Sequence, residues 1–409
     1  MVLFCKNTPS ENLLAFPPLT FRTLMTSPIT LTREEELHWI ALRMVPGLGL
    51  RKAGLLIEKF KTPVRIFRAS RSELEACGLA GGIAQTIASG CTFEDAVDQQ
   101  QKIIDTGTTL ISLTDPRYPP RLRDIFDPPV VLFVRGRIEL LETVMLGIVG
   151  TRRPTQYGLA ATERLAADLS QAQLTIASGM ASGIDTAAHK AVLAVKGNTV
   201  AVLGCGVDLV YPAENRKLAS DLAQNGLLLS EFPMGAPPFP QNFPIRNRII
   251  SGMSVGVMVV EGAQYSGSAI TARLAMDQGR EVFAVPGNIT SKLSWAPNLL
   301  IKQGAKLVQE WNDVIVELQP EDRRRLIVNG QRHLLGDTGA PDNSPAEPPQ
   351  AAVGREILAR LKPDVALHLD ALLETLEYHS SSEVIAALFE LEMLGLVRQL
   401  PGKNFVKVW

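Results

Sequence analysis

The residues best suited to hold a phosphate backbone lie close together in the middle of the chain. Arg246 and Arg248 flank Asn247, and Phe239 and Phe243 come a few residues before them. Guanidinium groups match the geometry of phosphate oxygens, and aromatic faces stack on unpaired bases. Surface arginines are usually only solvated, but these precede an apolar run and lie among prolines and aromatics, where free solvation is less favoured. The mixture predicts a site for a single-stranded polynucleotide.

Three shorter segments have the composition of anion-binding turns. They are rich in glycine and hydroxyl groups, and each comes between an apolar run and an expected helix. Their residues are Gly150 and Arg152; Ser178 and Gly179; and Ser266, Gly267 and Ser268. Glycine lets the backbone approach a ligand, and the helix that follows points its free amide groups at the same place. One such turn means little, but several in succession predict a crevice lined with phosphate-binding groups.

Two enzymatic interpretations of these segments fail on the sequence. Ser178, Asp185 and His189 are the residue types of a hydrolytic triad, but no Gly-x-Ser-x-Gly elbow surrounds the serine. Asp185 and His189 are four residues apart, so they are expected to pair or to cap a helix. The run that begins at Gly204 is not Gly-x-Gly-x-x-Gly, so a dinucleotide site is not indicated.

The elements that position these segments alternate between strand and helix over residues 111–318. Apolar runs predict strands at Val130–Val134, Val144–Val149, Leu174–Ala177, Thr199–Leu203, Gly226–Ser230, Val255–Val260 and Val282–Val285. Helical patterns lie between them, as at Tyr157–Ala172 and Ala187–Val195. This alternation is typical of an α/β fold, a Rossmann-like doubly wound parallel sheet. In such sheets ligands collect beyond the carboxyl ends of the strands, where the segments above lie.

Length and charge narrow the function further. The 409 residues suggest two or three domains, and 41 Lys and Arg against 42 Asp and Glu give a net charge of −1. This balance excludes a protein that coats nucleic acid through bulk charge, so a polyanion site must be local. Four cysteines without metal-ligand spacing and the lack of a long apolar run favour a cytoplasmic protein without a metal site or a membrane span. Residues 1–30 are expected to be a flexible leader, and Met25 is a possible alternative start.

Residues 31–110 are expected to form a helical domain. Thr32 and Glu35 match a helix capping box. Val45-Pro-Gly-Leu-Gly49 followed by a helical pattern is typical of a helix-hairpin-helix, a small SAM-like fold, with Arg51 and Lys52 just beyond its turn. Such a turn can present amide groups to a phosphate. The alternative, a hairpin that only packs, remains open.

The C-terminal part is expected to be a linker, 319–353, and a winged helix, 354–409. Helical patterns at Arg355–Leu361, Leu369–Leu376 and Ser382–Leu394 precede two strands, Leu396–Leu400 and Asn404–Val408. The last of these helices carries three glutamates and no Lys or Arg, so phosphate repulsion argues against its insertion into a DNA groove. We expect a protein contact or a regulatory cap, with Lys403 as the likeliest residue of this domain to meet phosphate.

Taken together, these segments resemble the DNA-processing protein A family, also called Smf. The matching pieces run in family order: Gly150-Thr-Arg152, Ser178 to Asp185, Ala201 to Gly204 with Asp208 and Tyr211-Pro212, Phe243 to Ile250, Glu261 with Ser266 to Ser268 and Thr271, and Gly279 to Gly287. They span about residues 115–318, and jointly they are highly specific. The helical N-terminal part and the winged helix are similar to the family's usual flanks.

The resemblance implies a protein that is not an enzyme and needs no cofactor. Such proteins bind incoming single-stranded DNA during natural transformation, shield it and load the RecA recombinase. By the resemblance, the DNA site falls on Gly150, Arg152, Ser178, Gly179, Arg246, Asn247, Arg248, Ser266, Gly267 and Ser268. A homodimer interface is implied at Asn298, Leu299, Ile301, Lys302 and Leu307.

Three positions depart from the family pattern. Ala213 and Ser182 stand where basic residues are common, which lowers the expected charge of the pocket. Ala296 replaces a frequent glycine in the loop before the implied dimer segment.

Two other functions are compatible with parts of the sequence but are less favoured than DNA binding. A nucleotide-processing enzyme related to the nucleoside-monophosphate phosphoribohydrolases shares the Rossmann-like layout, but the corresponding run from Glu261 lacks the motif Pro-Gly-Gly-x-Gly-Thr-x-x-Glu. A transcription regulator that reads duplex DNA is disfavoured by the acidic helix of the winged-helix domain.

Overall fold

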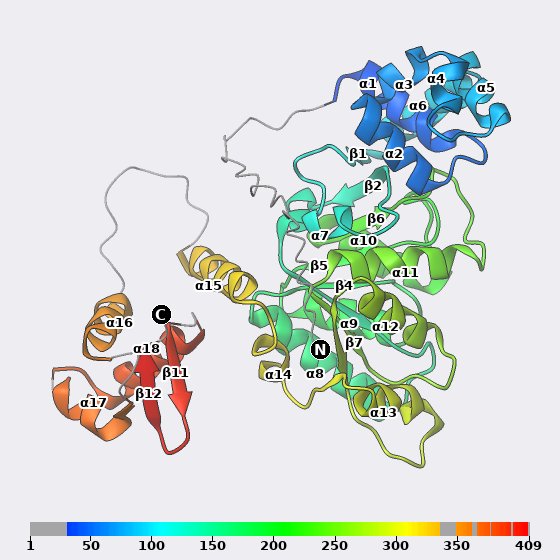
Figure 1. Ribbon diagram of the computed structural model, residues 1–409. Coiled ribbons are helices and arrows are strands. Elements are labelled where there is room, and N and C mark those ends of the chain that lie inside the picture. The colour runs from blue at the N-terminus through cyan, green and yellow to red at the C-terminus, as the bar shows by residue number, and fades with distance from the viewer. Residues whose placement is uncertain (1–30, 336–348, 362–365, 377, 394–395, 408–409) are drawn as a thin grey trace, which may run out of the picture.

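The protein is described here by a computed structural model, which covers residues 31–335, 349–361, 366–376, 378–393 and 396–407. The expected leader, 1–30, lies outside the described residues. Figure 1 shows a helical N-terminal part, a central sheet with helices on both faces, and a small C-terminal domain.

The N-terminal part consists of six helices. They are α1 (Arg33–Met44), α2 (Leu50–Phe60), α3 (Pro63–Arg68), α4 (Arg71–Glu75), α5 (Gly81–Ser89) and α6 (Phe93–Thr106). The predicted capping box is present, because Thr32 Oγ1 accepts from the Glu35 amide and the Glu35 carboxylate accepts from the Thr32 amide. α1 and α2 form the two helices of the expected hairpin, and Gly47 at φ +74° makes the turn between them.

This helical part shares its core with the central sheet. Trp39 and Leu42 of α1 belong to the same buried cluster as Phe133 and Leu203 of the central domain. The side-chain amide of Gln99 donates to the Met234 carbonyl and accepts from the Met234 amide. Residues 31–110 therefore do not form an isolated domain.

The central sheet has nine strands in the order β1-β2-β6-β5-β4-β3-β7-β8-β9. Their bounds are β1 Thr109–Ser112, β2 Val131–Gly136, β3 Met145–Val149, β4 Thr175–Ser178, β5 Thr199–Val202, β6 Leu227–Ser230, β7 Gly256–Val259, β8 Glu281–Ala284 and β9 Lys306–Leu307. All neighbours from β6 to β9 are parallel, as predicted, whereas β1 and β2 are antiparallel additions at one edge. The short strands β1 and β9 were not predicted, because each carries too few apolar residues to form a recognisable run.

Helices cover both faces of the sheet, which confirms the doubly wound fold (Figure 1). The helices are α7 (Pro120–Arg123), α8 (Gln156–Gln171), α9 (Ile184–Ala194), α10 (Arg216–Asn225), α11 (Asn242–Met253), α12 (Gly267–Asp277), α13 (Trp295–Lys302), α14 (Asn312–Ile315) and α15 (Pro320–Leu335). Side chains of α8 and α9 pack in one buried cluster, and those of α11 and α12 pack in another. The chain runs from β3 out to β6 and then crosses to β7 on the other side of β3. This reversal brings the loops after β3 and β7 to one crevice at the carboxyl ends of the strands.

The segment predicted as a linker, 319–353, is in part a docked helix. α15 occupies Pro320–Leu335, and its Leu326 is buried in the core cluster that contains α8. Asp322 is buried and forms an ion pair with Arg121. Because the segment has few apolar residues, its sequence did not indicate that Leu326 and Asp322 are buried against the central domain. Residues 336–348 lie outside the described ones.

The C-terminal domain has three helices and a three-stranded sheet in the order β10-β12-β11. Its elements are α16 (Pro349–Arg360), β10 (Leu367–His368), α17 (Leu369–Thr375), α18 (Ser381–Met393), β11 (Val397–Leu400) and β12 (Asn404–Lys407). The predicted winged helix is confirmed, with β10 as an additional strand. It has a buried cluster of its own, built from Val353 onward.

Candidate functional site

A pocket of about 450 Å³ opens at the carboxyl ends of β3, β4 and β7, and we call it the strand-end pocket. It is formed by the loops after these strands together with the start of α11 and α12. Seven of the ten residues predicted for the DNA site line it: Gly150, Arg152, Arg246, Asn247, Ser266, Gly267 and Ser268. The other three, Ser178, Gly179 and Arg248, are not among its lining residues.

Arg152 is the cation most available to a ligand in this pocket. It is exposed, and its guanidinium carbon lies 5.4 Å from the centre of the Phe243 ring. The ring of Tyr211 lies 5.4 Å from that of Phe243, so the two aromatic side chains form one wall. A guanidinium on an aromatic face keeps its hydrogen-bonding edge free for a phosphate. Tyr211 belongs to the family pattern described above. Nothing in the residues around it in the sequence indicates that its ring faces the pocket.

The start of α12 provides the second anion-binding feature. Ser266 caps the helix by accepting from the Ala269 amide, and its hydroxyl lies 2.8 Å from that of Ser268. The amides of Gly267 and Ser268 belong to the first turn, where a helix offers them no internal acceptor. Hydroxyl groups and free amides at a helix start are suited to a phosphate oxygen.

Arg246 lines the pocket, but its side chain is buried in the protein below the pocket floor. Only 3% of the residue is exposed, and its guanidinium donates to the Val202 carbonyl. Burial lowers the pKa of Arg246 to about 10, so the side chain remains charged at neutral pH. Its Nε has no hydrogen-bond partner among the described residues. Arg246 therefore contributes positive potential to the pocket and is not the exposed phosphate contact that the sequence suggested.

Gly179 makes room for this buried guanidinium. A Cβ at position 179 would lie 2.2 Å from Arg246 Nη1, closer than atoms approach. The Gly179 amide donates to Asp185 at 3.1 Å, and the Ala181 amide donates to the same carboxylate oxygen at 3.4 Å. Burial raises the pKa of Asp185, while the charge of Arg246 and these two amides oppose the rise. Gly179 and Asp185 thus support Arg246, and Asp185 also lines the pocket.

The prediction that Arg248 takes part in the pocket is wrong. Its guanidinium is buried and forms an ion pair with Glu231, and Asp127 lies 3.3 Å from its Nε. Arg43 of α1 donates to the Glu231 backbone carbonyl at 3.3 Å. Arg248 lies two residues after Arg246 on α11, so the two side chains cannot share one helix face. The bond from Arg43 to Glu231 ties the helical part to the central domain beside this buried pair.

Ser178 and Glu261 form hydrogen bonds with backbone groups of the loops around the pocket. The Ser178 hydroxyl is buried and donates to the Ile148 carbonyl at 2.6 Å. Glu261, which follows β7, accepts from the Thr155 amide at 2.8 Å, and its own carbonyl accepts from the Thr151 amide. These bonds hold the loops after β3 and β7 together. Gly150 lets α9 approach, because a Cβ there would lie 2.5 Å from Ile184.

The hydrolytic triad that the sequence allowed is not assembled. His189 does not pair with Asp185; its Nδ1 lies 2.7 Å from Thr199 Oγ1. The Thr199 hydroxyl donates to the Ile176 carbonyl, so His189 must donate through Nδ1 and keep a bare Nε2. Complete burial lowers the pKa of His189 to about 3. This neutral, enclosed imidazole is structural.

The residues implied for a dimer interface lie on α13 and β9. Asn298 bonds the backbone of Gly287 in both directions, and Ile301 packs against the core. Leu299 is half-buried and Lys302 is exposed. Leu307, on the edge strand β9, is 42% exposed.

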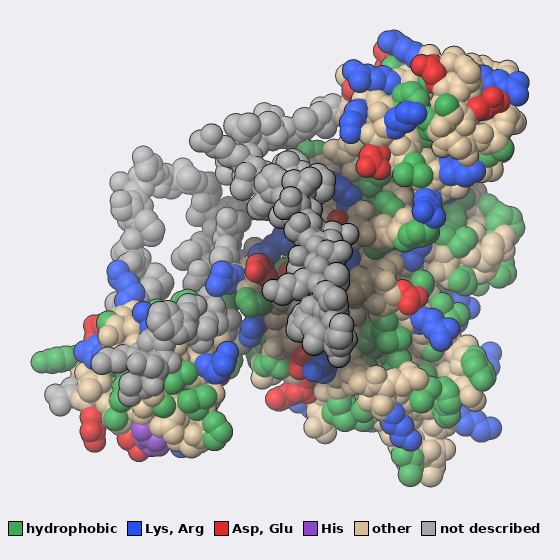
Figure 2. All heavy atoms as spheres, in the orientation of Figure 1, with side chains coloured by type: hydrophobic (Ala, Val, Ile, Leu, Met, Phe, Trp, Pro, Cys, Tyr) green, Lys and Arg blue, Asp and Glu red, His purple; other side chains and the backbone are tan. Residues whose placement is uncertain are grey.

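Charge on the molecular surface is mixed. In Figure 2, Lys and Arg side chains are interspersed with Asp and Glu over the central and helical parts, without a continuous basic face in that view. None of the helices in the described part of the chain is both long enough and apolar enough to cross a membrane.

Comparison with known proteins assigns the chain to a family. Residues 109–319 match the family described as DNA recombination-mediator protein A, and residues 341–403 match the DprA winged helix domain. Protein Smf of Escherichia coli is 43% identical over 289 residues, which are 70% of this chain and 74% of that protein. Protein Smf of Synechocystis is 33% identical over 92% of this chain and 99% of its own length. The chain belongs to the DprA/Smf family of DNA-processing proteins.

A solved structure agrees with this assignment. The crystal structure of DNA processing protein A from Streptococcus pneumoniae matches with a TM-score of 0.62 and 33% identity, covering 71% of this chain and 99% of that one.

Proposed function

We propose that this protein binds single-stranded DNA in the strand-end pocket and handles DNA taken up during natural transformation. The observation that carries the proposal is the position of Arg152, exposed on the face of Phe243 at the mouth of a pocket that also contains the first turn of α12. A guanidinium, free amides and two aromatic rings are the groups that hold phosphates and unpaired bases.

The pocket suits a single strand better than a duplex. Its volume of about 450 Å³ is that of a small cleft, and stacking on Phe243 and Tyr211 needs a base that is not paired. Because the net charge of the chain is −1, affinity must come from this local group of contacts and not from bulk attraction.

The decisive test compares Arg152→Ala with Arg153→Ala. Both arginines are exposed and adjacent, but only Arg152 lines the pocket. Loss of a charge-assisted hydrogen bond is worth about 1.5–3 kcal/mol, so we expect R152A to weaken oligothymidylate binding about tenfold or more. The slope of log K against log salt should fall by about 0.7. Fluorescence anisotropy across a salt series measures both.

Equal effects of R152A and R153A would contradict the pocket assignment, since they would indicate a diffuse surface charge. A duplex of equal length that binds as well as the single strand would contradict the preference for unpaired DNA.

We infer that this binding involves no turnover. The acidic and imidazole groups near the pocket are engaged: Asp185 by two amides, Glu261 by Thr155, and His189 by Thr199. The rival function, nucleotide hydrolysis like that of the phosphoribohydrolases, predicts release of adenine from AMP. Steady adenine release by purified protein, lost in a pocket variant, would establish that rival.

We further propose that the bound strand is passed to the RecA recombinase and that the protein acts as a homodimer in the cytoplasm. The recombination-mediator family supports the first step, and the exposed Leu307 on an edge strand supports the second. The test is the lag before RecA filaments form on single-stranded DNA covered with single-strand-binding protein, which the protein should shorten and R152A should not.

A further inference from the structure

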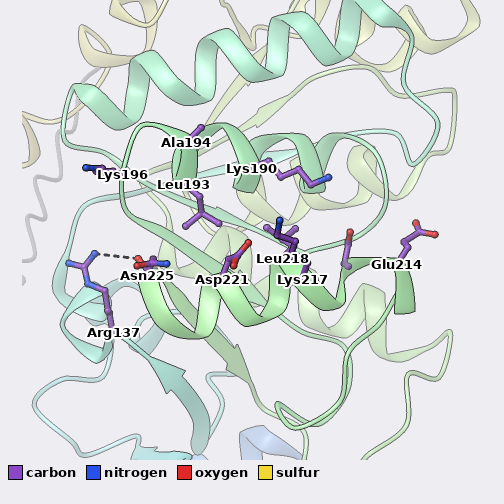
Figure 3. Close-up of a pocket in the computed structure, with 12 residues that line it drawn as sticks. Arg137, Lys190, Leu193, Ala194, Lys196, Glu214, Lys217, Leu218, Asp221 and Asn225 are labelled. Carbon is purple, nitrogen blue, oxygen red and sulfur yellow. Dashed lines mark hydrogen bonds between the residues drawn. The ribbon is translucent and has the colours of Figure 1, made fainter.

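A groove of about 1060 Å³ lies between α9 and α10, and the proposed function does not use it (Figure 3). Residues 190, 193 and 194 on α9 and residues 217, 218, 221 and 225 on α10 recur at helical spacing, so each helix gives the groove one face. Leu193, Ala194 and Leu218 provide its apolar part. We call this cavity the α9–α10 groove.

Basic side chains line this groove along its length. Lys190, Lys196 and Lys217 are exposed, and none of them forms an ion pair in the part of the chain that the structure describes. Arg137 closes one end, where it bonds Asn198 and the Asn225 carbonyl. Arg137 also forms an ion pair with Glu139, so the unpaired charge that faces this space comes from the three lysines.

Two carboxylates also face the groove, Glu214 and Asp221. Glu214 accepts a hydrogen bond of 2.6 Å from Ser182, so one of its oxygens is engaged. Asp221 lies on the middle of α10, and no ion pair is recorded for it among the described residues. Because the charge of Arg137 is offset by Glu139, the count is three unpaired lysines against two carboxylates, and the groove keeps a small positive excess in a chain whose net charge is −1.

The groove and the strand-end pocket are lined by successive stretches of the same loop. Ala181 and Tyr211 line the pocket, while Glu214 and Asn215, three and four residues after Tyr211, line the groove. Asn215 donates to the Met180 carbonyl at 2.9 Å, which joins the groove to the segment that precedes Ala181 of the pocket. Figure 3 shows Glu214 at one end of the groove and Lys196 and Arg137 at the other, so the basic residues lead away from the pocket.

From this continuity we propose that the α9–α10 groove is a second binding segment for the same single strand. The strand leaves the pocket past Ser182 and Glu214 and lays its phosphates against Lys190, Lys217 and then Lys196. This inference rests on the proposed function, because it extends the path of the DNA that the pocket holds. The groove would hold the backbone without base specificity, since ammonium groups contact phosphates and do not read bases.

A polynucleotide fits these features better than a folded protein or a small anion. Unpaired lysines spaced along an open groove match a chain of repeated phosphates, while the apolar side chains can cover sugar and base faces. A small anion site would need its cations to converge on one point, but Lys190 lies within α9 and Lys196 lies beyond its end, well separated in Figure 3.

The test uses full-length protein and two oligothymidylates, one of about six nucleotides and one of about 25, within and beyond the span of a single-strand pocket. The double variant Lys190→Ala, Lys217→Ala should weaken binding of the long strand about tenfold. The slope of log K against log salt for that strand should fall by about 1.4, because each of the two lost phosphate contacts accounts for about 0.7. Binding of the short strand should stay within twofold of the unaltered protein. The matched control is a second double variant, Lys61→Ala, Lys102→Ala, which removes two exposed lysines outside the groove.

A second variant, which should strengthen binding, shows whether misfolding explains the weaker binding of the double variant. Asp221→Asn removes the free carboxylate that faces the strand, so it should strengthen long-strand binding several-fold and leave the short strand unaffected.

Failure of this inference is distinct from failure of the proposed function. If neither oligonucleotide binds the unaltered protein, both fall. If both bind and the groove variants change them equally, or change neither, the groove is not part of the path. Unchanged DNA binding with a longer lag in RecA assembly would also overturn it, because the groove would then be a protein contact.

Discussion

Arg152, Arg246 and Arg248 carry the same side chain, but the fold gives each a different role. Arg152 is exposed on an aromatic ring, Arg246 is buried beneath the pocket, and Arg248 is buried against Glu231. A buried guanidinium is retained only where a carboxylate or carbonyl compensates its lost hydration. Glu231 has this role for two arginines, since Arg43 also bonds its backbone.

Replacement of Glu231 by Gln should therefore destabilise the fold without altering the DNA site. The neutral amide leaves the buried charge of Arg248 with only Asp127, and loss of one partner from a buried pair costs about 3–5 kcal/mol. Urea denaturation measures the change. Glu139→Gln, which breaks an exposed pair with Arg137, should cost less than about 1 kcal/mol. If E231Q binds DNA more weakly but is as stable as the unaltered protein, Arg248 belongs to the DNA-binding site and this assignment is wrong.

His189 should make the protein sensitive to mild acid. Its pKa is lowered from 6.5 to about 3 by burial, so below pH 6.5 the unfolded chain takes up a proton that the folded chain does not. Stability from the neutral imidazole is present above pH 6.5 and is lost as the pH falls toward 3. Between pH 6.5 and 5 the loss is about 2 kcal/mol, at 1.36 kcal/mol per unit. His189→Gln should show a shallower decline in unfolding free energy over that interval; parallel curves for the two proteins would refute the assignment.

At the scale of elements, α15 extends the central domain beyond the last strand. Two polar contacts of α15 reach residues far back in the chain: Asp322 pairs with Arg121, 201 residues earlier, and Arg325 donates to the Glu142 carbonyl, 183 residues earlier. A docked helix here means that the connection to the winged helix is shorter than composition suggests.

Leu326→Ala should lower the unfolding free energy by about 2–4 kcal/mol, because it empties a buried site. Differential scanning calorimetry of the full chain follows the effect. Arg324→Ala, two residues away and exposed, is the control and should change stability by less than about 0.5 kcal/mol. If both variants melt like the unaltered protein, α15 is not docked and the segment is a linker after all.

At the scale of the whole molecule, the sheet ends at β9, whose outer edge pairs with no other strand of the described chain and whose two residues are exposed. Leu307 is 42% exposed there, and Trp295, at the start of the neighbouring α13, is 41% exposed. Uncovered edges with exposed apolar side chains tend to pair with another chain. This fits the dimer segment that the family resemblance implies.

Leu307→Glu should convert a dimer into a monomer, since a charge buried at an apolar contact is strongly disfavoured. Light scattering coupled to size-exclusion chromatography gives the mass. Leu55→Glu, an equally apolar and 52% exposed position on α2, should leave the mass unchanged. A monomer in the unaltered protein at tens of micromolar would exclude the proposed interface.

The sequence determined those features that depend on neighbours along the chain. The parallel strands β3 to β8, the capping box at Thr32 and the glycine-rich turns follow from local patterns of apolar, capping and flexible residues. Because parallel strands end at the same edge, the sequence also indicated that the turns after them would meet, and the strand-end pocket does unite seven of the ten predicted residues.

Only the tertiary structure decided which charges face the ligand. Arg248 and Glu231 are 17 residues apart, and Asp322 and Arg121 are 201 apart, so no local pattern shows that these pairs are buried together. The lysines of the α9–α10 groove are likewise unremarkable in the sequence, because their common orientation depends on two helices that pack side by side. Burial and charge pairing are set by contacts between distant parts of the chain, and these form only when the sheet and its helices have assembled.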